Sequence, residues 1–295
     1  MCDMKRLTAA CGLLTLLSLT VPAQQPEQSA TTANQSAAAA VETDQEKLFK
    51  AIESGDTGEV IKILDAGADP NVIEEEQSAL VAAVRFNRAD IAEILLQRGA
   101  SVDPEEAGEG SALQIAAMIG RTSLVKLLIA HRADVNHMDH DGNPPLLLAV
   151  MGAMFKNTPA WLVRSYLEID DDEKIVKEIG NEHLESARLL IQAGAKVNGP
   201  ATEDGMTALM WAAKAGDLEM TKLLLDSHAD PNEYDGEGRT ALKLAEEFDS
   251  KEELAERLSR RGSDERKQAL MDWVHFTAPG RKAVAAMLRT AGARR

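Results

Sequence analysis

The sequence predicts an all-α solenoid built from short helix–turn–helix units. A leucine that follows Ser-Ala, Thr-Ala or Pro-Pro recurs along the chain, most often at a spacing of 33 residues. After each of these leucines come two apolar stripes with helical periodicity, and the second stripe ends near a turn related to Gly-Ala-Asp-Pro-Asn. One helix pair cannot cover its own apolar face, whereas stacked pairs bury a continuous core.

Composition agrees with a helical solenoid and narrows the choice of partner. Hydrophobic residues make up 44% of the 295 residues but aromatic residues only 3%, so the core consists of Leu, Ala, Ile and Val, which favours helices over sheet. The formal net charge is -16. Such a chain repels phosphate backbones, which argues against nucleic acid as a partner, and it favours a basic protein partner.

The first 23 residues have the features of a cleaved signal peptide. Lys5 and Arg6 precede an apolar stretch over residues 7–21 that is too short to span a bilayer, and Val21-Pro22-Ala23 suits cleavage after Ala23. An uncleaved N-terminal anchor, or lipidation of Cys11, is the alternative. We therefore expect a periplasmic or secreted protein with no membrane span after cleavage.

The predicted cleavage also removes both cysteines, Cys2 and Cys11. The mature chain could then be neither a disulfide scaffold, a zinc–thiolate protein nor a cysteine enzyme. Residues 24–43, which are rich in Gln, Ser, Thr and Ala, are predicted to form a disordered linker.

The repeats are predicted to run over residues 44–262. The recurring motif stands at residues 78–80, 111–113, 144–146, 207–209 and 240–242, with leucine spacings of 33, 33, 63 and 33. Its Ser or Thr can cap the first helix of a unit, and Pro suits the first helical position. Paired alanines such as 82–83, 116–117 and 212–213 allow close helix packing, and a glycine after the second helix can adopt the left-handed C′ conformation.

Two segments depart from the period. Residues 153–181 interrupt the fourth unit, and we expect a helical insertion carrying Phe155, Trp161 and Tyr166. These aromatic residues either pack on the fourth unit or form a binding surface. Residues 263–295 are expected to form a C-terminal helical cap or a degenerate seventh repeat.

The unit resembles the ankyrin repeat. The resemblance rests on residues 139–146, Asp-His-Asp-Gly-Asn-Pro-Pro-Leu, and on residues 235–242, Asp-Gly-Glu-Gly-Arg-Thr-Ala-Leu, and covers six units from about residue 44 to 262. Arg132 and His228 replace the C′ glycine, and Glu76 and Glu109 stand where a turn glycine belongs. The resemblance implies binding of another protein through the turns and first helices. The positions implied are Met138, His140, Asp141, Met206, Met210, Trp211, Lys214, Tyr234, Glu237 and Arg239, with Trp211 alternatively wedged between units.

The sequence offers little for catalysis. The cluster at residues 137–141 could bind a metal, but it is better explained as a turn tip, and the acidic run 170–173 fits a helix start better than a calcium loop. Nucleophile elbows, phosphate loops and dinucleotide motifs are missing from the sequence, so we expect no cofactor, no metal and no enzyme. The expected function is a protein-interaction module of the bacterial cell envelope, or alternatively a secreted effector or inhibitor of a host or competitor protein. An enzyme built on the insertion is a third hypothesis.

Overall fold

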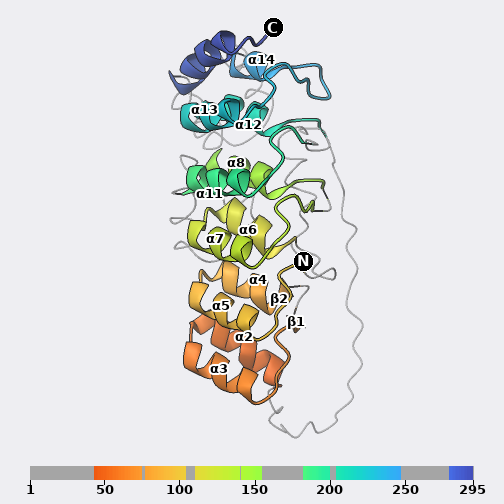
Figure 1. The fold of residues 1–295 in the computed structure, drawn as a ribbon, viewed down its shortest axis with the longest axis vertical. Coiled ribbons are helices and arrows are strands. Elements are labelled where there is room, and N and C mark those ends of the chain that lie inside the picture. The colour runs from red at the N-terminus through yellow and green to blue at the C-terminus, as the bar shows by residue number, and fades with distance from the viewer. Residues whose placement is uncertain are drawn as a thin grey trace, which may run out of the picture.

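The protein is represented by a computed structural model that describes residues 43–74, 77–103, 110–139, 141–154, 182–199, 204–246 and 279–294. The predicted signal peptide and all of the predicted linker except Thr43 lie outside these residues. The described residues form pairs of short helices stacked along one axis (Figure 1). The prediction of an all-α solenoid is confirmed. In these ranges, none of the helices is long and apolar enough to cross a bilayer.

Each unit contributes a first and a second helix. The first helices are α2 (Asp44–Ser54), α4 (Ala79–Arg85), α6 (Ala112–Ile119), α8 (Pro145–Met154), α12 (Ala208–Ala215) and α14 (Ala241–Glu246). The second helices are α3 (Thr57–Asp65), α5 (Ala89–Gln97), α7 (Thr122–Ala130), α11 (His183–Gln192), α13 (Leu218–Asp226) and a helix over residues 279–290. Between the first two units, β1 (Ile73–Glu74) and β2 (Gln77–Ser78) pair antiparallel, with Ile73 opposite Ser78.

The predicted caps begin the first helices. Ser78, Ser111 and Thr207 each accept the backbone N–H three residues later, which satisfies one of the amides that a helix start leaves free. Thr240 does the same for Lys243, and Pro145 opens α8. Thr43, placed in the linker by the sequence prediction, forms a capping box with Glu46, so the folded region starts one residue earlier than expected.

The second helices end in the left-handed conformation that the turn motif predicts. Gly67, Gly99 and Gly194 have φ of 100°, 93° and 97°. Arg132 and His228 occupy the same position with φ of 68° and 66°, although a side chain is disfavoured there. The backbone therefore keeps the turn geometry where the sequence departs from glycine.

The core runs continuously through the stack. The motif leucines Leu80, Leu113, Leu146, Leu209 and Leu242 are buried, as are the paired alanines of α4, α6 and α12. The small alanine side chains allow neighbouring helices to approach closely. Since each unit buries apolar surface against its neighbours, stability depends on contacts between neighbouring units.

Asparagine side chains join successive units. Asn136 donates from Nδ2 to the carbonyl of Gly194 and accepts the N–H of Lys196 at 2.8 Å. Asn71 makes the equivalent pair of bonds with Gly99 and Ser101, and Asn198 with His228 and Asp230. Each asparagine thus satisfies two backbone groups of the following turn, a role that the sequence prediction did not identify.

The last unit differs from the prediction. Its first helix, α14, is followed by residues 279–290 in the place of the second helix, because Arg294 N–H donates to Asn232 and Thr240 Oγ1 donates to the carbonyl of Arg294. Arg289 also pairs with Glu246 of α14, and Val284 and Leu288 are fully buried in the core. Residues 279–294 therefore complete the sixth unit, instead of forming a separate cap or seventh repeat after residue 262.

The interruptions in the fourth and sixth units fall at the same place. In the fourth unit α8 and α11 are separated by residues 155–181, and in the sixth unit α14 and the helix over 279–290 are separated by residues 247–278; both segments lie outside the described residues. Ala153 and Met154, which the sequence prediction gave to the insertion, still belong to α8. Both extra segments thus enter the unit between its first and second helix.

Candidate functional site

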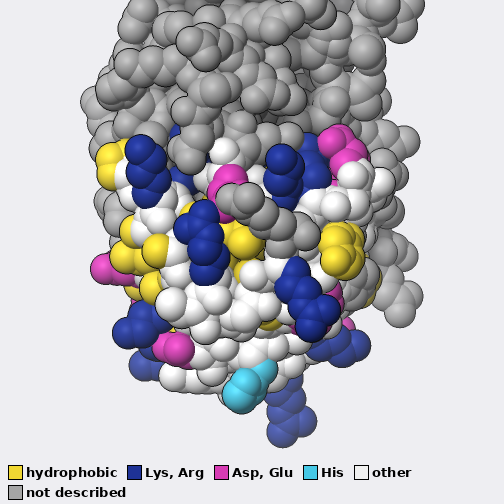
Figure 2. Space-filling view, turned by 90° about the horizontal axis from the view of Figure 1, so that it is seen from above, with side chains coloured by type: hydrophobic (Ala, Val, Ile, Leu, Met, Phe, Trp, Pro, Cys, Tyr) yellow, Lys and Arg dark blue, Asp and Glu magenta, His cyan; other side chains and the backbone are white. Residues whose placement is uncertain are grey.

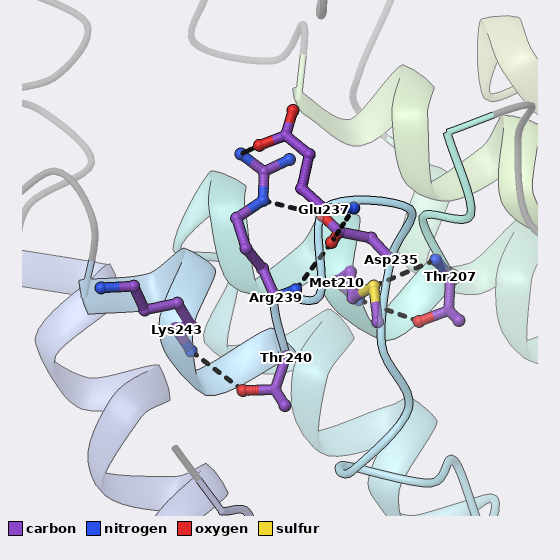
Figure 3. Close-up of polar contacts among 7 residues, drawn as sticks. All are labelled: Thr207, Met210, Asp235, Glu237, Arg239, Thr240 and Lys243. Atoms are coloured by element: carbon purple, nitrogen blue, oxygen red, sulfur yellow. Dashed lines mark hydrogen bonds and ion pairs between the residues drawn. The ribbon is translucent and has the colours of Figure 1, made fainter.

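The turns between units end in tips that an aspartate organises. Asp235 Oδ1 accepts the N–H groups of Glu237 and Arg239 at 3.0 and 2.7 Å, and Oδ2 accepts Nε of Arg239 at 2.8 Å (Figure 3). Asp139 makes the matching bonds to the N–H groups of Asp141 and Asn143. Both aspartates are buried, so their carboxylates hold the turn in shape.

Neighbouring parts of the stack fix the position of each tip. The N–H of Gly236 donates to the carbonyl of Asp204 in the preceding tip at 2.7 Å. Gln114 of α6 donates to the carbonyls of His137 and Asn143 at 3.1 and 2.9 Å. The tips therefore form a row. The backbone of each of these tips is held by hydrogen bonds from the preceding tip or from a first helix.

Two exposed apolar side chains stand on this row. Met138 is 42% exposed and Tyr234 is 60% exposed, and each lies directly before the aspartate that organises its tip. They occupy equivalent positions two turns apart. The other large apolar side chain reported as exposed among the described residues, Leu218 at 39%, lies at the start of α13 and not on a tip. Met138 and Tyr234 are thus the large apolar side chains, among the sequence-predicted contact residues described, that the structure leaves open to a partner.

Met206 and Met210 are not open to a partner, and this corrects their prediction as surface contacts. They are only 2% and 1% exposed. Met210 lies in the first turn of α12, where its sulfur accepts the N–H of Thr207 at 3.5 Å (Figure 3). Gln114 fills the equivalent place in α6 and is also buried. The first turn of each of these first helices faces the next unit, so a side chain at this position packs within the stack.

The sequence left open whether Trp211 contacts a partner or is wedged between units. Trp211 is buried in α12, as expected of a residue wedged in the stack. Lys214, one turn later, is half-buried and holds its ammonium 4.9 Å from the centre of the indole ring. Lys214 is therefore engaged with Trp211, which leaves it less available to a partner than the tip residues are.

Several predicted site residues fall outside the described residues. These are His140 and the three aromatic residues of the inserted segment, Phe155, Trp161 and Tyr166. Arg239 is described, and its guanidinium pairs with Asp235 and Glu237 within its own tip. Within the described ranges, no group of three or more His, Cys, Asp or Glu side chains could hold a metal ion.

The surface around Tyr234 is acidic. Asp204, Asp230 and Glu237 are exposed beside it, and Glu233 is half-buried. Partial burial, and then the charge of Asp230, raise the pKa of Glu233 above its usual value. Burial, the larger cause, disfavours the charged form of Glu233, and the charge of Asp230 adds to this effect.

Comparisons with known proteins agree with the repeat architecture. A family model described as ankyrin repeats (three copies) matches residues 48–139 and 175–269. The second match includes residues 247–269, which lie outside the described part, whereas the described contacts place residues 279–290 in the sixth unit.

The chain is also similar to parts of larger proteins. It is 28% identical to protein glp-1 of Caenorhabditis elegans over 64% of this chain and 13% of that protein. It is 25% identical to the ankyrin repeat and KH domain-containing protein mask-1 of the same organism, over 61% of this chain and 7% of that protein. It is 28% identical to human mitochondrial disaggregase over 65% of this chain and 29% of that protein. The chain thus spans less than a third of each of these relatives.

Proposed function

Because the chain belongs to the ankyrin repeat family, a family of protein–protein interaction modules, we propose that it binds a partner protein through the row of turn tips. The observation that carries this proposal is the exposure of Met138 and Tyr234 at equivalent positions of two rigid tips. Exposed aromatic and methionine side chains are enriched at protein interfaces, where they provide apolar contact area.

The proposed partner is basic. The support is the group of exposed acidic side chains near Tyr234, namely Asp204, Asp230 and Glu237. Arg239 is the cation that this tip itself carries, and Asp235 and Glu237 already compensate it. Electrostatic attraction would mainly accelerate association, and salt would weaken it.

The proposed role is non-catalytic. Asp139 and Asp235, the buried carboxylates of the tips, are used to fix the turns, so they are not poised for acid–base chemistry. The polar groups of the tips are explained by turn geometry, which gives no separate nucleophile and base.

We place the proposed interaction in the bacterial cell envelope. The support is the sequence of residues 1–23, with its basic start, short apolar stretch and small residues at 21–23. The alternative is a secreted effector or inhibitor that acts on a host or competitor protein. Fractionation of the native host separates the two, since the first requires retention in the periplasm and the second requires release into the medium.

The binding proposal is tested by affinity capture from envelope extract with the mature chain, followed by titration of the isolated partner. Replacing Tyr234 with Ala is expected to weaken binding about tenfold or more, and Met138→Ala should also weaken it. Leu218→Ala is the matched control, because it removes an exposed leucine away from the tips.

If Tyr234→Ala and Leu218→Ala have equal effects, the tips are not the binding site. A variant that lacks residues 155–181 then tests whether the inserted segment, with its three aromatic residues, carries the binding instead. The sequence prediction was made for a variant lacking residues 153–181. It expects the solenoid to stay folded, because this deletion brings the leucine spacing of 63 back close to the 33-residue period.

A further inference from the structure

The end of the solenoid that the sixth unit forms carries cations where inner units contact their successors. Lys243 lies in the first turn of α14, at the position that Met210 and Gln114 fill in inner units. Those two side chains are buried, whereas Lys243 is exposed. The difference arises because no seventh unit covers α14 in the described structure.

Two positions of the second helix in the sixth unit also hold cations where inner units hold uncharged side chains. Lys282 precedes the left-handed Gly292 by the same number of residues as Thr122 precedes the left-handed Arg132. The hydroxyl of Thr122 contacts Glu182 and Ser186 of the next unit. Arg289 corresponds in the same way to Leu64, which is buried, and to the half-buried residues Leu96, Ile129, Ile191 and Leu225. In the last unit both positions hold exposed cations.

We call the surface formed by Lys243, Lys282 and Arg289 the C-terminal end face. Its net charge is positive, because Glu246 pairs with Arg289 but Lys243 and Lys282 are also present, although the chain carries -16 overall. Residues 279–294 contain four Lys or Arg and no Asp or Glu, but Arg281 is fully buried and does not add to the surface charge. The acidic residue of α14 is Glu246, which pairs with Arg289. Figure 2, which views the molecule from this end, shows Lys and Arg side chains over the described part, with Asp and Glu side chains among them.

The acidic body of the chain does not cancel this local charge. At physiological ionic strength charges are screened over roughly 8 Å, and packed helices lie roughly 8–10 Å apart. Charges more than one unit away are therefore largely screened at the end face. A polar end is needed to keep a solenoid soluble, but a mixture of charges would achieve this equally well.

We propose that the C-terminal end face binds an acidic segment of a protein partner. The cations border small exposed residues, Ala283 and Ala286, on the same helix. A polypeptide can combine carboxylate contacts to the cations with apolar contacts to these alanines, whereas phosphate groups would gain nothing from the alanines. This surface is opposite in charge to the tip around Tyr234, so the two proposals concern different partners and can fail independently.

The test measures anisotropy of a labelled peptide of alternating Glu and Ala, about 12 residues long, with the full mature chain at low ionic strength. The unaltered chain is expected to bind this peptide. The variant K243E/K282E should bind it about tenfold more weakly. The matched control K126E/K222E makes the same change of charge at exposed lysines on α7 and α13, and it should stay within about twofold.

Two further probes distinguish the class of ligand: anionic phosphatidylglycerol vesicles and a short DNA duplex. Both are expected to bind more weakly than the acidic peptide. Circular dichroism verifies that each variant is folded, and K243Q/K282Q replaces the reversal variant if the latter unfolds. The proposal is overturned if the acidic peptide does not bind, if test and control variants lose equal affinity, or if vesicles or DNA bind more tightly than the peptide.

Discussion

Replacing Gly152 with Ala is expected to destabilise the fourth unit, although alanine is normally the better helix former. Gly152 lies near the end of α8, where an added Cβ would collide with the backbone carbonyl of Met118 in α6 and with the ring of His183 in α11. The carbonyl and Nε2 of His183 are already in hydrogen-bond contact at 2.8 Å. A backbone carbonyl cannot rotate out of the way, so the helices must separate.

The magnitude follows from three effects. Overpacking costs roughly 1–3 kcal/mol, and weakening the His183–Met118 hydrogen bond costs about 1 kcal/mol. The higher helix propensity of alanine relative to glycine offsets about 1 kcal/mol of this loss of stability. The net loss of unfolding free energy is thus roughly 1–3 kcal/mol, which corresponds to a decrease in Tm of roughly 2–4 °C per kcal/mol for a domain of this size.

Gly58→Ala is the matched control for this change. Gly58 also lies in a helix, α3, but the nearest atom to an added Cβ is the Asp56 carboxylate oxygen at 3.4 Å, an ordinary contact. This variant should be more stable by about 0.5–1 kcal/mol. Urea denaturation followed by circular dichroism measures both. If Gly152→Ala is stabilising to the same extent as Gly58→Ala, the close approach of α8, α6 and α11 is refuted.

Three other changes test the turns. His228→Gly should raise the stability by on the order of 1 kcal/mol, because φ at this position is 66°; a lower Tm in a thermal melt would mean that His228 makes compensating contacts. Asn198→Ala should cost about 1–3 kcal/mol, because two hydrogen bonds to the next turn are lost, and amide exchange at Asp230 should accelerate; unchanged exchange would argue against the asparagine bridge. Glu233→Gln should raise the stability at neutral pH, because the raised pKa shows that the ionised carboxylate is disfavoured in the folded state. This gain should decrease as the pH falls through the raised pKa and vanish below the ordinary pKa of glutamate, where the carboxyl is protonated in both the folded and the unfolded state. A gain that persists in acid would contradict the proposed cause, which is the cost of the ionised carboxylate.

The sequence by itself determined the architecture of the unit. The caps at Ser78, Ser111 and Thr207 are local signals, since each hydroxyl bonds an amide three residues away. The left-handed turn at His228 could be predicted despite its side chain, because the surrounding residues match the turn motif. The exposed position of Tyr234 follows in the same way from its place on a tip.

The tertiary structure decided which residues each unit buries against the next. Met210 and Lys243 occupy the same position of a first helix, yet the inner one is buried and the last one is exposed. Their local sequences do not reveal this difference, because it depends on whether another unit covers the helix.

The tertiary structure also decided where the last unit ends. Residues 247–262 carry Leu254 and Leu258 at a helical spacing, as residues 279–290 carry Val284 and Leu288, so periodicity alone did not select between the two segments. In the structure Val284 and Leu288 are fully buried, and Arg294 N–H reaches Asn232, 62 residues earlier in the chain. A local pattern specifies the conformation of a segment, but its place in the stack depends on contacts with residues distant in the sequence.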